Sequence, residues 1–99
     1  MLIGKIIGTV VCTQKDEKLV GAKLQVVLPL HASTLSPDGK PIVAIDSIGA
    51  GSHELVLVVT GSSARQTQKT KDTPVDAVII AILDSLEVEG KLTYQKAGG

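Results

Sequence analysis

Residues 42–65 constrain the fold most, because two short apolar runs in this stretch are each followed by a turn of small residues. The runs, Ile42–Ile45 and Leu55–Val59, are rich in β-branched side chains, which favour strands. Gly49–Gly51 separates the two runs, and Gly61–Ala64 follows the second. The pattern predicts a strand, a tight corner, a second strand and another tight corner. Backbone exposed at both corners suits a surface that packs against other chains.

Other β-rich segments lie on both sides of this stretch. Leu2–Thr13 predicts a long, curved first strand, and Gly4 and Gly8 inside it indicate a bend or a close backbone approach, as at a barrel corner. Lys23–Leu30 predicts a second strand that ends near a proline, and Leu92–Tyr94 predicts a short last strand after a Glu-Gly-Lys turn.

Pro74–Leu86 is ambiguous. Thr73 followed by Pro74 resembles a helix N-cap with proline at the first helical position. The apolar block Ala77–Leu83, however, is seven residues long and contains a β-branched run, which favours a buried strand over a helix. We therefore interpret this block as a strand and keep the helix as the alternative.

The polar segments between these runs are interpreted as loops. They are Gln14–Gly21, His31–Pro41 with its Pro-Asp-Gly turn, and Gln66–Thr73. The predicted fold is all-β: a small, partly open, OB-like barrel of about five to six strands, with at most a short helical turn. We expect residues 1–99 to form a single domain.

Composition excludes several classes of protein. Ten basic residues balance ten acidic ones and Tyr94 is the only aromatic residue, which speaks against nucleic-acid binding. No apolar run approaches the length of about 18 residues that spans a membrane, and no signal peptide is expected. With 43% hydrophobic residues in so short a chain, we expect some apolar surface to lie between subunits.

The single cysteine, Cys12, cannot form an internal disulfide. It lies in an apolar run, so we interpret it as a small buried thiol.

The residues give little sign of catalysis. Asp46, His53, Ser62 and Ser63 are the types used in a nucleophilic triad, but no nucleophile elbow surrounds the serines. Two histidines and one cysteine do not have metal-ligand spacing. Gly49–Gly51 is either a phosphate cradle or, as we favour, a tight turn. We expect no catalytic residue, no metal and no cofactor.

Asp46 lies at the end of an apolar run that should be mostly buried. A buried carboxylate must be hydrogen-bonded or paired. Arg65 is the candidate cation for it, within one chain or between chains.

Four segments together resemble a known family. They are Gly8–Thr13 with Leu19–Leu24, then Val43–Gly51, then Gly61–Arg65, and finally Pro74–Ala77 running to Ile82–Asp84. In this order they resemble the bacterial microcompartment vertex proteins of the EutN/CcmL family, over nearly the whole chain. One departure lies in the central turn, where His53 replaces a usual glycine and Leu55 a usual aromatic residue. The departure puts in doubt the usual conformation of that turn and its contacts with neighbouring shell tiles.

The resemblance implies a small β-barrel that assembles as a homopentamer in the bacterial cytoplasm. Such pentamers occupy the vertices of a polyhedral shell, contact hexameric shell proteins, enclose metabolic enzymes and have no catalytic activity. The alternative from the residues alone is an OB-like module that binds a small molecule or an oligonucleotide. The residues that we expect at a subunit or shell-tile interface lie in the two turns: Asp46, Gly49, Ala50, Gly51, Ser52, His53, Glu54, Gly61, Ser62, Ser63, Ala64 and Arg65.

Overall fold

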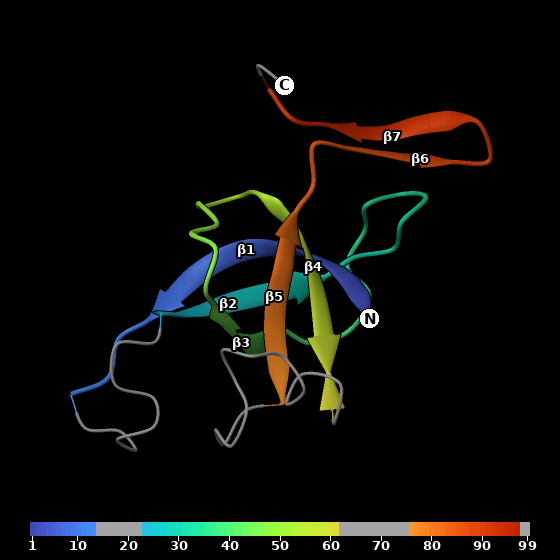
Figure 1. Ribbon diagram of the computed structural model, residues 1–99. Helices are drawn as coiled ribbons and strands as arrows, with labels where there is room; N and C mark the ends of the chain where they lie inside the picture. The colour runs from blue at the N-terminus through green and yellow to red at the C-terminus, as the bar shows by residue number, and fades with distance from the viewer. Residues whose placement is uncertain (14–22, 62–75, 98–99) are drawn as a thin grey trace.

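The computed structural model describes residues 1–13, 23–61 and 76–97. Five strands close into a barrel with the order β1-β2-β3-β5-β4 (Figure 1). Their bounds are Leu2–Val10 (β1), Lys23–Pro29 (β2), Ile42–Asp46 (β3), Leu55–Thr60 (β4) and Ala77–Ile82 (β5). The all-β prediction is confirmed, and the block that admitted either a helix or a strand is the strand β5.

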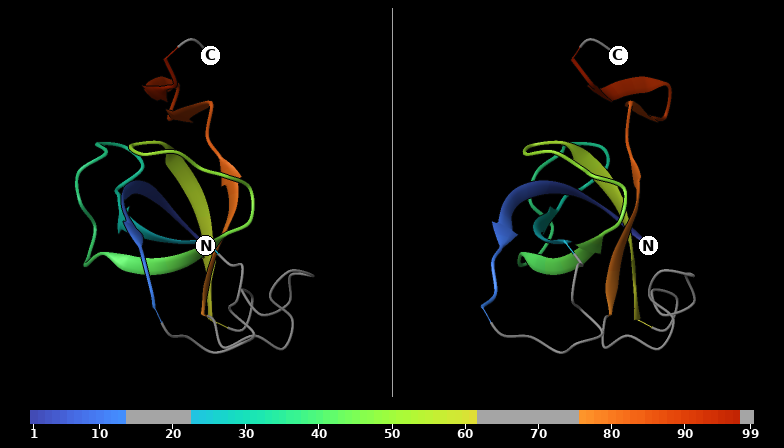
Figure 2. Two further views of the ribbon diagram at one scale, coloured as in Figure 1. Left: turned by 90° about the vertical axis from the view of Figure 1, so that its left-hand side faces the viewer. Right: turned by 60° about the vertical axis from the view of Figure 1, so that its left-hand side comes forward.

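Two further strands form a separate hairpin. β6 (Ser85–Val88) and β7 (Lys91–Gln95) pair antiparallel as a two-stranded sheet. The hairpin stands away from the barrel in Figure 1 and in both views of Figure 2. The last strand was predicted, but β6 was not, because its alternating residues Ser-Leu-Glu-Val form too short and too polar a run.

A short parallel contact closes the barrel. β3 and β5 pair in parallel through Ile45 with Val78 and Asp46 with Ile79, whereas the other barrel pairs are antiparallel. The expectation of a partly open barrel is therefore wrong. Nothing local in the sequence indicates this pairing, since it joins residues more than thirty positions apart.

Aliphatic side chains fill the barrel interior. The buried cluster comes from all five barrel strands and the corner after β3: Ile6, Val27, Ala44, Ala50, Val56, Val58, Ala77 and Ile79. Each fully buried Val or Ile contributes about 1.5–3 kcal/mol of transfer free energy. A second cluster of Leu30, Leu55 and Leu83 contacts Leu86 and Tyr94, which places the base of the hairpin against the barrel.

β1 is shorter than predicted, and this corrects the interpretation of the cysteine. β1 ends at Val10, whose partner on β2 is Leu24. Cys12 lies two residues beyond this last pair and is exposed rather than buried. An apolar run in the sequence did not reveal where the strand pairing ends.

None of the described residues forms an α-helix, and the same residues contain no helix long and apolar enough to cross a bilayer.

Candidate functional site

The corner after β3 is built around the carboxylate of Asp46. Its Oδ1 accepts hydrogen bonds from the backbone N–H groups of Ile48 and Gly49, each at 2.9 Å. Its Oδ2 accepts one from the N–H of Ala50 at 2.8 Å. Asp46 is only 5% exposed, so three successive amides are held by one buried carboxylate. Gly49 adopts the left-handed backbone conformation, φ 83°, that this wrapped turn requires.

A buried glutamine joins this carboxylate to β1. The Gln25 side-chain amide donates to Asp46 Oδ2 at 3.2 Å and to the Ala50 carbonyl at 2.9 Å. The Gln25 Oε1 accepts from the Thr9 hydroxyl at 2.9 Å. Gln25 is 2% exposed, and none of the buried side-chain N or O atoms that the structure describes lacks a hydrogen-bond partner. The network therefore spans β1, β2 and the corner without an unpaired group.

These hydrogen bonds determine the charge state of Asp46. Burial raises the pKa of a carboxyl group, but here the N–H groups of Ile48, Gly49 and Ala50 together with the Gln25 amide outweigh it. The net pKa of Asp46 lies below its ordinary value of 3.8. The carboxylate is ionised at neutral pH and acts as the charged acceptor that holds the corner.

The phosphate-cradle interpretation of Gly49–Gly51 is not supported by this geometry. The amides of Gly49 and Ala50 point to the Asp46 carboxylate, and the amide of Gly51 donates to Glu54 Oε1. A phosphate would have to displace two carboxylates of the same chain to reach these donors. The corner is a tight turn, which is the interpretation that the sequence favoured.

Glu54 links the corner to the hairpin. One carboxylate oxygen accepts from the Gly51 amide, and the other lies 2.8 Å from the Nζ of Lys96, just after β7. The contact with Lys96 is the main cause that lowers the pKa of Glu54, and it raises the pKa of Lys96 in turn. The Lys96 amide also donates to the Asp84 carbonyl at 2.8 Å. The backbone bond closes the base of the hairpin, and the Lys96 side chain attaches that base to the corner.

His53 occupies a left-handed position in the corner. Its φ is 67°, and its backbone N–H donates to the Ile6 carbonyl at 2.9 Å. The turn therefore closes onto β1 although histidine stands where the family usually has glycine. The second departure, Leu55, is buried in the cluster with Leu30 and Leu83, so its side chain packs within its own chain.

The left-handed φ of His53 should affect the stability of the fold, which substitutions at this position can test. We expect His53→Gly to raise the free energy of unfolding by about 0.5–1 kcal/mol, because glycine adopts this φ without a steric penalty. His53→Val should lower it by about 1–2 kcal/mol, because a β-branched residue is strained there. Urea unfolding measures both. Ser52→Gly is the control: Ser52 has no positive φ, so glycine should bring no gain, and equal gains at both positions would contradict the argument.

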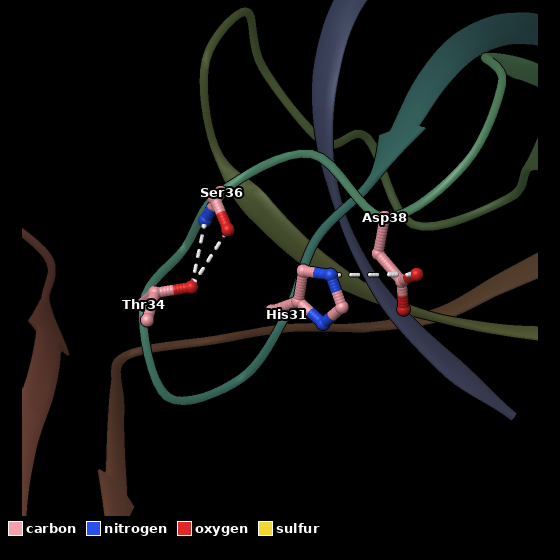
Figure 3. Close-up of polar contacts among 4 residues, drawn as sticks. All are labelled: His31, Thr34, Ser36 and Asp38. Atoms are coloured by element: carbon pink, nitrogen blue, oxygen red, sulfur yellow. Dashed lines mark hydrogen bonds and ion pairs between the residues drawn. The ribbon is translucent and has the colours of Figure 1, made fainter.

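The other histidine lies in a self-contained loop between β2 and β3 (Figure 3). His31 Nε2 lies 3.6 Å from Asp38 Oδ1, and both side chains are more than half exposed. The Thr34 and Ser36 hydroxyls share a 2.7 Å hydrogen bond, and the His31 amide donates to the Ser36 carbonyl. Among the residues that the structure covers, no three His, Cys, Asp or Glu side chains gather as a metal site.

The second predicted corner is described only at its start. Gly61 has a φ of 66°, and its amide donates to the Asp76 carbonyl at 2.8 Å. The other candidates of this corner, Ser62, Ser63, Ala64 and Arg65, lie outside the described residues. The two corners flank β4 at its opposite ends, roughly 20 Å apart for a six-residue strand. One chain does not bring them together.

Sequence reasoning missed three residues of the first corner: Thr9, Gln25 and Lys96. Gln25 alone carried a signal, as a single polar residue at an inward position of an apolar strand. The partners of Asp46 that the structure describes are an amide side chain and three backbone N–H groups. The proposed pairing with Arg65 lies outside the described residues.

Comparison with known proteins identifies close relatives. Residues 1–84 match the family model for ethanolamine utilisation protein EutN/carboxysome. The shell vertex protein GrpN of Rhodospirillum rubrum is 47% identical over 88% of this chain and 97% of its own. The shell vertex protein EutN of Salmonella typhimurium is 43% identical over 97% of this chain and 96% of its own.

Solved structures of vertex proteins have the same fold as this chain. The structure of Gloeobacter violaceus CcmL superposes with a TM-score of 0.90 at 39% identity, over 98% of this chain and 99% of that one. The pentameric microcompartment shell protein GrpN from Rhodospirillum rubrum superposes with a TM-score of 0.79 at 46% identity, over 89% and 99% of the two chains. With the family model and these relatives spanning most of its length, the chain belongs to the EutN/CcmL family.

Proposed function

We propose that this chain is a structural shell protein whose homopentamers occupy the vertices of a bacterial microcompartment. The observation that carries the proposal is the match to vertex proteins over nearly the whole chain, including one relative whose structure is a pentameric shell protein. A flat hexagonal layer cannot close into a polyhedron without fivefold positions. A pentamer supplies the curvature that hexameric tiles lack.

The partners follow from this role. The proposed contacts are with copies of the same chain, with hexameric shell proteins at the rim of the pentamer, and with encapsulated enzymes on the inner side. The proposed location is the microcompartment shell within the bacterial cytoplasm. We propose no catalytic activity and no cofactor for the chain itself.

The two corners are the proposed interface. Gly49, Gly51, Ser52 and His53 are exposed at the first corner, and Gly61 is exposed at the second. A closed ring needs two different complementary patches on each subunit, and two corners at opposite ends of β4 meet this requirement. Asp46 and Ala50 are buried, so they would act by shaping the first corner rather than by touching a neighbour.

Native mass spectrometry tests the assembly. Five chains of 10.2 kDa should give one species of about 51 kDa. A single chain, or a ring of another number, would contradict the vertex role. A monomer or dimer that binds single-stranded oligonucleotides with strong salt dependence would instead support the binding-module alternative.

A further inference from the structure

The β6–β7 hairpin has more apolar surface than its own chain covers. An isolated two-stranded hairpin is only marginally stable in water. Leu86 and Tyr94 pack against the barrel, but no residue of the hairpin is fully buried. Leu92, the most exposed apolar side chain of the hairpin, is 57% exposed. The hairpin therefore leaves apolar surface, above all the side chain of Leu92, that its own chain does not cover.

A second exposed apolar patch lies on the outer face of β1, β2 and β3. Val26 on β2 pairs with Val43 on β3, and Val43 is 50% exposed. Ile7 lies where the register of β1 against β2 shifts, and it is 43% exposed. We call Ile7, Val26 and Val43 the β1–β3 patch. Its three side chains are only part of the roughly 800 Å² that each partner contributes to a standard interface, so it serves as one contact within a larger one.

The hairpin and the β1–β3 patch lie at different ends of the molecule. In Figure 1 the hairpin is at the top and extends to the right, whereas β3 lies at the bottom and β1 ends at the left. One chain therefore cannot place its own hairpin on its own patch. A head-to-tail ring joins two such different surfaces, one from each of two neighbouring copies.

Charge favours the same pairing. Asp84, Glu87 and Glu89 are exposed on or beside the hairpin, against Lys91 at the start of β7 and Lys96, whose charge is paired with Glu54. The barrel strands β1, β2 and β3 carry Lys5 and Lys23, with Lys40 just before β3. Asp46 is the only acidic residue in these three strands, and it is buried and hydrogen-bonded. An acidic hairpin facing a basic barrel side is attractive, and such complementarity fixes which copy meets which face.

The hairpin is also held in place before assembly. The Lys96 backbone closes the base of the hairpin on Asp84, while the Lys96 side chain pairs with Glu54 and the Leu86 and Tyr94 side chains pack against the barrel, so the base is fixed. A preformed projecting element loses less conformational entropy on docking than a free tail does.

From these observations we propose that the β6–β7 hairpin is an assembly arm that docks on the β1–β3 patch of a second copy of this chain, with Leu92 against Val43. The proposal rests on the ring proposed above and names its contact surface. It adds a subunit contact, made by the hairpin, that the two corners do not supply.

Cysteine crosslinking tests the contact. In a Cys12→Ser background, Leu92→Cys and Val43→Cys are combined, and the protein is treated with a short-spacer bis-maleimide. If the hairpin docks on the neighbouring copy, a denaturing gel should show crosslinked species of two to five chains. The matched control combines Leu92→Cys with Ser36→Cys, an exposed site in the loop between β2 and β3, and should give no ladder. Native mass spectrometry is run on the same samples before crosslinking.

The outcomes separate the arm from the ring. A native mass of about 51 kDa together with a crosslinked ladder in the Leu92→Cys/Val43→Cys variant supports docking of the hairpin on a neighbouring copy. The same mass with no ladder, or with an equal ladder in the control, overturns the arm and leaves the pentamer standing. A single-chain mass for the wild-type protein overturns both.

Hydrogen exchange on the wild-type protein gives a second measurement that needs no substitution. The amides of β6 and β7 should exchange at least about tenfold more slowly in the ring than in protein diluted to single chains. Equal exchange rates would overturn the arm.

Discussion

Replacing Asp46 with alanine is expected to lower the free energy of unfolding by about 3–5 kcal/mol, from a total of about 5–15 kcal/mol for a chain of this length. The carboxylate accepts from three backbone N–H groups and from the Gln25 amide; the bonds from Gln25 and Ala50 are buried, and those from Ile48 and Gly49 are partly buried. Alanine leaves the buried donors of Gln25 and Ala50 without an acceptor where water does not replace it. The corner should open and carry Ala50 out of the core cluster.

Urea unfolding at one fixed protein concentration measures this loss, since assembly adds to apparent stability. Asp46→Asn should cost about 1–3 kcal/mol, because either orientation of its amide turns an NH₂ group toward N–H donors. Asp38→Ala is the control, since that exposed carboxylate makes only a 3.6 Å contact with His31, and it should change stability by less than about 0.5 kcal/mol. Equal effects of Asp46→Ala and Asp38→Ala would refute the assigned role.

The pH dependence gives the same prediction a second readout. The folded pKa of Asp46 lies below its ordinary value of 3.8, so its contribution is present above that value and is lost as the pH falls through the folded pKa. The stability difference between wild type and Asp46→Ala should therefore be full at neutral pH and shrink in strong acid. A difference that stayed constant from pH 7 to well below 3.8 would contradict the charged-acceptor role.

The strands were predictable because their cause is local. β-branched runs such as those of β3 and β4 favour extended backbone whatever they pair with, and both were found within one residue of their predicted ends. The corner after β3 was predictable from its glycines for the same reason. Local chemistry also indicated that Asp46 would be buried and would need partners.

What could not be predicted depends on contacts between distant segments. Gln25 meets Asp46 across 21 residues of sequence, and only the barrel register brings the two side chains together. The parallel closure of β3 on β5 and the exposure of Cys12 are likewise set by where strand pairing begins and ends. The left-handed φ of His53 follows from a corner that must close onto Ile6. A single sequence does not show which distant segments come into contact.

Gly4→Ala is expected to lower the free energy of unfolding by about 2–4 kcal/mol, because overpacking a closed barrel forces side chains and backbone to move. A Cβ at this position would lie 2.3 Å from Val27 Cγ1 and 3.1 Å from the Leu28 carbonyl oxygen. Val27 is fully buried, so its side chain has no free space to enter. The carbonyl belongs to the β1–β2 ladder, so relieving that contact disturbs strand pairing.

Gly8→Ala is the matched control, in the same strand. Its new Cβ would lie 3.6 Å from the Val26 side chain, an ordinary contact, and it should change stability by less than about 1 kcal/mol. Both variants lose the same glycine entropy in the unfolded chain, so the difference between them isolates the clash. Adding Val27→Ala to Gly4→Ala should recover part of the loss, although Val27→Ala alone is destabilising. If denaturant midpoints show Gly4→Ala to be as well tolerated as Gly8→Ala, β1 does not approach β2 as closely as this barrel requires.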